Sequence, residues 1–314
     1  MKKDNAAISK ASFRSRAKKD IRAHRTIYIM VIPVILFYVL FCYKPMYGLL
    51  MAFQNYSPSE GISGSEWVGM THFIDFVKSS DFPRLIRNTL AVSICSLVFG
   101  FPAPIIFALL LNEVRQTKYK RVIMSFSYLP HFISLVVICG MIKTFVSRTG
   151  VITVVLSGLF GIPQEDLLSN PGFYLPIYTL SSIWQGMGWD AIIYIAALSG
   201  VDAALYEAAT IDGAKKFQQM LHVTIPAILP TIIIMLILKI GQLLNVGYEK
   251  TLLLYNPVIY NRADIISTYV YRMAFEGQQW SYTTAIGLFN AVINFMLVVF
   301  ANKISGALTE TSLW

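Results

Sequence analysis

Long apolar stretches alternate with polar segments along this chain. Six of them come close to the roughly 20 residues that a helix needs to cross a hydrocarbon core about 30 Å thick. They are residues 26–43, 89–111, 122–142, 173–200, 225–244 and 282–301. Prolines such as Pro33, Pro102 and Pro230 lie inside these stretches, which membrane bundles tolerate because neighbouring groups satisfy the freed carbonyls. The pattern predicts an all-α integral membrane protein with six transmembrane helices.

Composition supports a membrane location. Hydrophobic residues make up 55% of the 314 residues and charged residues only 14%, whereas soluble domains carry roughly 25% charged residues. The mean hydropathy is +0.58. The cysteines Cys42, Cys95 and Cys139 lie inside apolar stretches without metal-ligand or disulfide spacing, so we interpret them as small buried hydrophobic residues.

The basic residues set the orientation. Nine Lys and Arg residues precede residue 26 against two acids, and the short loop 112–121 has four against one. By the positive-inside rule both segments lie in the cytoplasm, and six spans return the C-terminus to the same side. Segments 44–88, 143–172 and 245–281 then face outward. No small-residue cleavage site follows Cys42, so residues 26–43 are interpreted as an uncleaved first helix in a multi-pass protein of the bacterial cytoplasmic membrane.

The sequence has no motif for chemistry of its own. It contains neither a G-x-x-x-x-G-K-[ST] phosphate loop nor a G-x-S-x-G nucleophile motif, and its four histidines are far apart. We therefore expect no catalytic site, no metal and no cofactor on this chain. The energy for any transport must come from another polypeptide or from an ion gradient.

The segment 201–226 is too polar to span a membrane but rich in helix formers. Gly213, preceded by Asp212, favours a bend between two short helices. Ala208 and Ala209 offer a smooth face that a partner could approach closely, and Glu207 offers one charge. On composition alone, a plain surface loop is an equally good interpretation.

These residues resemble a known signature. Glu207-Ala208-Ala209, three residues, Gly213, nine residues and Val223-x-Ile225-Pro226 are similar to the "EAA" motif of type I ATP-binding-cassette importer permeases. The resemblance implies a transport domain at 85–303 with a coupling loop at 201–224. A basic arm (1–25), a first helix with outer loop (26–84) and a cytoplasmic tail (304–314) would flank it.

In that family the loop docks on the ATPase, so Glu207, Ala208, Ala209, Asp212 and Gly213 would form that contact. The resemblance also implies four kinds of partner, namely a second permease subunit, two cytoplasmic ATPase subunits that hold ATP and Mg, an extracellular solute-binding protein and the membrane lipid. Nucleic acid is not among them.

Finer resemblance points to the cargo. The runs YLPHFIS at 128–134, NVGYEK at 245–250, LYNP at 254–257 and TYVYR at 268–272 are similar to the subgroup that imports oligosaccharides such as aldouronate, alginate-type and pectin-derived glycans. An ion-coupled secondary transporter is the alternative, which would require titratable relays and inverted repeats. A membrane-embedded enzyme is a third possibility, disfavoured by the missing nucleophile and base.

Two residues of the Asp, Glu, Lys and Arg classes fall inside the predicted spans. Counted from the cytoplasmic ends of their helices at 1.5 Å per residue, Asp190 and Lys239 both lie about 15–21 Å into the membrane. Because such charges are costly there, we predict an Asp190–Lys239 ion pair, with separate exposure to water as the alternative.

Amides and aromatic rings in the same spans could bind the hydroxyls and C–H faces of sugars, although amides also join membrane helices and Trp often lies at interfaces. The predicted substrate path comprises Trp184, Gln185, Trp189, Asp190, Gln242, Asn245, Asn290 and Asn294.

Overall fold

The computed structural model describes residues 20–114, 116–245, 247–309 and 312–313. The chain divides into two compact units, Met1–Met70 and Thr71–Trp314. The predicted transport domain, 85–303, lies within the second unit, which also includes the helix before it. The reason is that Phe76 of α5 (Thr71–Lys78) is buried against Phe82 and Phe289, with ring centroids 5.1 and 5.6 Å away. Most of the predicted basic arm lies outside the described residues.

The first unit is a long helix followed by a small hairpin. α2 (Arg25–Phe37), a π-helical turn (Tyr38–Tyr43), α3 (Lys44–Met46) and a 3-10 segment (Tyr47–Phe53) form one helical stretch of 29 residues. None of its most apolar window is buried, as expected of a helix that faces lipid. The predicted span 26–43 is helical and continues to Phe53. Strands β1 (Gln54–Asn55) and β2 (Glu66–Trp67) then pair antiparallel around α4 (Gly61–Gly64).

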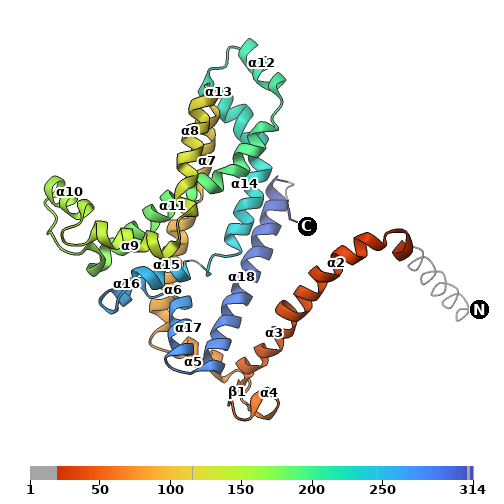
Figure 1. Ribbon diagram of the computed structural model, residues 1–314, viewed down its shortest axis with the longest axis vertical. Helices are drawn as coiled ribbons and strands as arrows, with labels where there is room; N and C mark the ends of the chain where they lie inside the picture. Colours follow the sequence, from red (N-terminus) through yellow and green to blue (C-terminus); the bar gives the residue numbers. More distant parts are fainter. Residues whose placement is uncertain (1–19, 115, 246, 310–311, 314) are drawn as a thin grey trace, which may run out of the picture. The chain divides into compact units, whose positions relative to one another are not determined.

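The regular secondary structure of the second unit, in its described residues, is all helical (Figure 1). After α5 its helices are α6 (Phe82–Cys95), α7 (Pro102–Asn112), α8 (Thr117–Tyr128), α9 (Leu135–Val146), α10 (Val151–Phe160), α11 (Pro171–Ser199), α12 (Ala203–Ile211), α13 (Lys216–Gln219), α14 (Ile225–Ile240), α15 (Tyr248–Leu254), α16 (Tyr260–Ala263), α17 (Ile266–Phe275) and α18 (Trp280–Thr309). Short π-helical turns, Ser96–Gly100 and Met220–Thr224, join α6 to α7 and α13 to α14.

Five helical stretches of the described residues are long and apolar enough to cross a membrane: Arg25–Phe53, Phe82–Asn112, Leu135–Phe160, Lys216–Ile240 and Trp280–Ala307. α11 and α12, bent by 70° relative to each other, pass the same test as a pair and give up to six. The prediction of an all-α membrane protein is confirmed. α18 also runs beyond the predicted end of its span at residue 301 and into the predicted tail.

The predicted third span, 122–142, is not one continuous helix. Leu129–Phe132 forms a 3-10 turn, and Ile133 and Ser134 are extended, with ψ of 134° and 136°. Pro130 lacks the N–H that a continuing helix needs, which favours a break at this point. The apolar sequence is therefore divided between α8 and α9. The predicted outer loop 143–172 contains α10.

α11 is the central helix of the second unit and packs along α7 while contacting α8 and α14. Gly188 permits the close approach to α8, because a Cβ there would lie 2.2 Å from the Ser127 carbonyl oxygen. Ala191 and Tyr194 pack with Ala108 of α7 and Ile228 of α14 in a buried cluster. One side of α11 is thereby fixed against its neighbours.

A buried ion network folds the segment between α14 and α18 onto α6. Asp264 is fully buried, and its carboxylate accepts hydrogen bonds from Arg272 at 2.7 and 3.2 Å and from Arg84 of α6 at 3.3 Å. Thr268 Oγ1 donates to the same carboxylate at 2.9 Å, and the Asn88 side chain donates to the Asp264 carbonyl at 2.9 Å. The predicted outer loop 245–281 is therefore a packed helical layer.

Candidate functional site

α14 ends at Ile240, and the next residues leave the helical path while still packed against α6 and α18. The Leu243 carbonyl accepts a hydrogen bond from Ser93 Oγ of α6. The Leu244 N–H donates to Asn294 Oδ1 at 3.1 Å, and the Leu244 carbonyl accepts from Asn290 Nδ2 at 3.3 Å. Side chains of two other helices thus satisfy the backbone groups that the break frees. In membrane proteins such irregular backbone is tolerated where it is buried in protein or lines a cavity.

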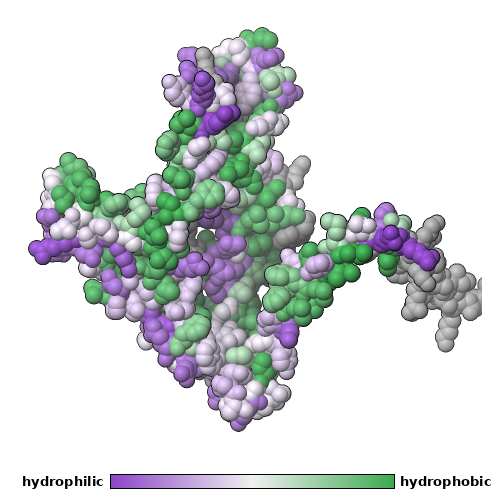
Figure 2. Space-filling view, in the orientation of Figure 1, coloured by the Kyte–Doolittle hydropathy of each residue, from purple (hydrophilic) through white to green (hydrophobic). Residues whose placement is uncertain are grey.

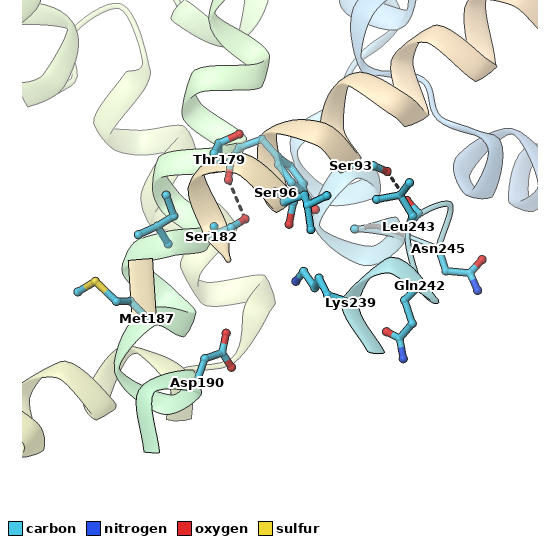
Figure 3. Close-up of a pocket in the computed structure, with 15 residues that line it drawn as sticks. Ser93, Ser96, Thr179, Ser182, Met187, Asp190, Lys239, Gln242, Leu243 and Asn245 are labelled. Carbon is cyan, nitrogen blue, oxygen red and sulfur yellow. Dashed lines mark hydrogen bonds between the residues drawn. The ribbon is translucent and has the colours of Figure 1, made fainter. Parts of the chain in front are cut away.

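A polar cavity of about 270 Å³ lies beside this break, between α6, α11 and the end of α14 (Figure 3). Its polar lining residues are Ser93, Ser96, Thr179, Ser182, Asp190, Lys239, Gln242 and Asn245. A second cavity of about 210 Å³ shares Asp190, Lys239 and Gln242 with it and reaches Tyr194 and Pro104. In Figure 2 hydrophilic side chains gather in the middle of this unit, inside a largely hydrophobic surface. The two cavities give the helices a polar interior.

Asp190 and Lys239 both line these cavities, as residues of α11 and α14 (Figure 3). In the described structure they do not form an ion pair, for which N and O atoms would have to lie within 4.0 Å. The predicted direct pair is therefore absent. The Asp190 carboxylate and the Lys239 ammonium instead belong to residues that line the cavities, where water or a ligand can solvate them.

The aromatic residues predicted for the path lie on different faces of α11. Trp189 stacks on His131, with ring centroids 4.5 Å apart and planes at 3°, and Phe132 meets its edge. Trp184 instead lines an apolar groove of about 450 Å³ between α9, α10 and α11. Trp184 lines neither polar cavity, because these lie on another face of the helix, and its role in the substrate path stays a prediction. Gln185 lines neither polar cavity.

Asn290 and Asn294 hold the broken end of α14 in place. Both side chains are buried, at 6% and 5% exposure, and they bind the backbone of Leu244. Asn290 Nδ2 also donates to Asn245 Oδ1 at 2.8 Å, and Asn245 lines the polar cavity. Neither Asn290 nor Asn294 lines that cavity. These contacts are the joining of helices by amides that was the alternative interpretation. Asn290 also lines a separate cavity of about 440 Å³ with Asn245, and contact of Asn290 or Asn294 with substrate stays a prediction.

Sequence reasoning missed the wall formed by Tyr178, Ser182 and the residues after the break. Gly247 has a φ of +66°, and a Cβ there would lie 1.7 Å from the Tyr178 hydroxyl. Lys250 of α15 is 5% exposed, and its Nζ donates to Ser182 Oγ at 2.9 Å and lies 5.4 Å from the Tyr178 ring centroid. The run NVGYEK, noted as a family feature, was the signal that could have located them.

The predicted coupling segment consists of two short helices with a bend, as expected. The Asp202 side chain caps α12 by accepting from the Ala204 N–H at 2.9 Å. Gly213, with φ of +78°, makes the bend before α13. Gln219 Nε2 donates to Thr210 Oγ1 at 2.9 Å and to the Ala214 carbonyl at 3.2 Å, which ties the two helices together.

The surface of this segment is open. Glu207, Ala208, Asp212 and Gly213 are exposed, Ala209 is half-buried, and Ile211 is 87% exposed. A groove of about 730 Å³ runs beside them, lined by Tyr206, Glu207, Thr210, Ile211, Ala214, Lys215, Lys216 and Gln219. The segment therefore presents an exposed apolar side chain beside an open groove. Among the described residues no cluster of His, Cys, Asp or Glu could hold a metal ion.

Comparison with known proteins identifies several relatives. The family model "Binding-protein-dependent transport system inner membrane component" matches residues 100–306. Protein LplB of Bacillus subtilis (strain 168) is 43% identical over 295 residues, covering 94% of this chain and 92% of LplB. The polygalacturonan/rhamnogalacturonan transport system permease protein YteP of the same organism is 39% identical over 310 residues, covering 99% and 97%.

A solved structure is similar over nearly its whole length. It is the crystal structure of a bacterial alginate ABC transporter in complex with an alginate pentasaccharide-bound periplasmic protein. The matching chain has a TM-score of 0.86 and 42% identity, and the match covers 94% of this chain and 99% of the other.

Proposed function

We propose that this chain, which belongs to the family of binding-protein-dependent transport system inner membrane components, passes oligosaccharides through the cytoplasmic membrane as the permease subunit of an ATP-driven importer. The family carries no catalytic centre, so ATP is hydrolysed elsewhere in the complex. Two of its relatives are described by oligosaccharide or polysaccharide cargo. The observation that carries the proposal is the polar cavity beside the broken end of α14.

The cavity has the chemistry that a sugar requires. Asp190 offers an acceptor for hydroxyl groups, and the amides of Gln242 and Asn245 each offer donors and an acceptor. Outside the two polar cavities, the stacked His131–Trp189 pair presents an aromatic surface for the C–H face of a pyranose ring, and Trp189 is next in sequence to Asp190. Sugar recognition generally combines these two kinds of contact. We infer that this side of α11 and α14 forms one wall of the substrate path.

A second permease subunit would supply the opposite wall. Asp190, Trp189, Lys239 and Gln242 are all exposed in the single chain, although they lie on apolar helices or, for Gln242, directly after one. Charged and amide groups in that position require a polar covering, because lipid cannot solvate them. A related permease with a similar polar face would enclose a water-filled path, and an extracellular solute-binding protein would deliver the sugar to it.

The α12–α13 segment would be the contact with the ATPase subunits, of which the complete transporter would hold two. Ala208 and Ala209 allow close approach, while Glu207 and the exposed Ile211 add one charge and one apolar anchor. α12 follows α11 after a bend of 70°. A push on α12 would therefore act at the cytoplasmic end of the helix that carries Asp190.

The test is an arginine placed on this surface. Ala209→Arg should lower ATP-driven oligosaccharide uptake at least tenfold and reduce co-purification of the ATPase, while insertion and binding of the second permease stay normal. Ala204→Arg is the matched control, because Ala204 is an exposed residue of the same helix outside the Glu207–Gly213 signature. Normal uptake by an inserted Ala209→Arg protein would refute the docking role. Uptake driven by an ion gradient without ATP would favour the secondary transporter instead.

A further inference from the structure

Lys250 is a buried cation without an acidic partner in the described structure. It is 5% exposed, and the ion pairs among the described residues do not include it. Its Nζ has one hydrogen-bond acceptor, Ser182 Oγ at 2.9 Å, and the Tyr178 ring centroid lies 5.4 Å away. An ammonium group has three donors, so this environment leaves most of its bonding capacity unused.

Such an arrangement is unfavourable for folding. α15 belongs to none of the candidate membrane spans, and burial lowers the pKa of Lys250 to about 8. At neutral pH the side chain still carries its charge most of the time. If Lys250 served only to fill space, an apolar side chain of similar length would do so without the cost of burying a charge. Ser182 does not require Lys250 either, because Ser182 Oγ already donates to the Tyr178 carbonyl at 2.7 Å.

The two neighbours of Lys250 are wall residues of the polar cavity. Ser182 and Tyr178 line it, and so does Gly247, from the turn that begins α15. Among the described lining residues, Lys239 is the one cation and Asp190 the one acid, while Lys250 lies behind the wall formed by Ser182 and Tyr178 and not in the lining itself. Two lysines against one aspartate give the cavity and its immediate wall a net charge of +1. A neutral sugar has no use for such an excess charge, whereas an anionic group would be attracted by it.

We propose that Lys250 is a specificity-determining residue of the substrate path: its charge, at the Ser182 wall, attracts a substrate carboxylate, so that oligosaccharides of uronic acids are preferred. This inference rests on the proposed function and deepens it. A carboxylate bound beside Ser182 would lie close enough to the Lys250 ammonium for an attraction that a low-dielectric site strengthens. No covalent step is involved.

The experiment uses the complete transporter in vesicles, with its partner permease, ATPase and binding protein. Uptake of trigalacturonate is compared with uptake of its methyl ester, in which the carboxyl charges are removed. Lys250→Met should lower uptake of the acid about tenfold, the usual effect of losing one charge-assisted contact, and leave uptake of the ester within about twofold. Lys143→Met is the control, because it removes the same charge from an exposed position on α9.

A second variant keeps the proposal testable if Lys250→Met assembles poorly. Ser182→Asp places a carboxylate beside the ammonium and should occupy the site of the substrate group. It should therefore impair uptake of the acid more than uptake of the ester. Equal losses for both sugars in the two variants, or no loss in either, would overturn the role of Lys250. Wild-type uptake of other oligosaccharides but of neither trigalacturonate nor its ester would also overturn the preference, whereas failure to take up any oligosaccharide would count against the proposed import function itself.

Discussion

Replacing Lys250 by methionine should stabilise the folded protein at neutral pH. Burial lowers the pKa of Lys250 from 10.5 to about 8. Each pKa unit corresponds to about 1.4 kcal/mol, so the charged form opposes folding by about 3 kcal/mol. The variant also loses the hydrogen bond to Ser182 and the contact with the Tyr178 ring, together worth about 1 kcal/mol. Met fills a similar volume, which leaves a net gain of about 2 kcal/mol.

The gain in the free energy of unfolding from Lys250→Met should decrease as the pH rises. Between pH 8 and 10.5 the unfolded chain binds more protons at Lys250 than the folded chain does, so wild-type stability rises with pH in that window. The cost of the buried charge is fully present below pH 8 and absent above the unfolded pKa. The advantage of Lys250→Met should therefore be largest near pH 7 and disappear, or reverse slightly, near pH 10.5.

Thermal unfolding of the detergent-purified protein measures this effect. At pH 7 the variant should melt about 4 °C above the wild type, from the usual relation between free energy and melting temperature in chains of this size. Lys143→Met, at an exposed position, should leave the melting temperature unchanged. A Lys250→Met variant that melts lower at pH 7, or by an amount independent of pH, would show that Lys250 is a compensated structural lysine. In that case, added trigalacturonate should not raise the melting temperature of the wild type more than that of the Lys250→Met variant.

Three further predictions concern the scaffold around the path. Gly247→Ala should cost about 2–4 kcal/mol in the free energy of unfolding, since the new Cβ meets Tyr178 at a positive φ; thermal melting measures it. Asp264→Asn should cost about 3 kcal/mol, because two arginines lose a buried carboxylate; the loss appears as lower yield and melting temperature. In a chain whose own cysteines are replaced, a cysteine at Ser63 should react with an impermeant reagent from outside, and one at Ser9 only after permeabilisation.

Each of these has an internal control. Adding Tyr178→Phe to Gly247→Ala removes the atom nearest the new Cβ and should recover part of the loss. Asp81→Asn removes a half-exposed partner of Arg84 and should cost under about 1 kcal/mol; a cost equal to that of Asp264→Asn would contradict the assignment of the buried network. Labelling of position 9 from outside would reverse the proposed topology.

Hydrophobic length predicted the helices well where one apolar stretch forms one helix. α11 begins and ends within two residues of the predicted 173–200, helped by the Asn170 cap, whose side chain accepts from the Gly172 N–H. The third predicted span failed because hydropathy does not register the backbone break at Pro130. The bend at Gly213 was predictable, since glycine is the residue that tolerates a positive φ without strain.

The candidate site was predicted less completely. Trp184 and Trp189 are five residues apart and so point about 140° from each other, which already excludes a common face. The sequence alone does not say which of these two faces of α11 is polar. The structure answers this, because Ser182 and Asp190 line the same cavity. Asn290 and Asn294 have the same chemistry whether they bind a sugar or a backbone. Lys250 was overlooked because the polar segment around it was interpreted as an exposed loop.

The Asp264 network also limits how the molecule can deform. It joins α6 to α17 through charges that are costly to separate, so the outer ends of these helices should move as a single rigid body during transport. Any rotation of the other helices must then take place at another part of the chain. The described non-helical residues directly after Ile240 lie beside the cavity and can change their backbone conformation. During transport, α6 and α17 would therefore move together, and the backbone after Ile240 would act as a hinge. A pair of spin labels on α6 and α17 should keep a constant separation through the ATP cycle, while a pair across the end of α14 should not.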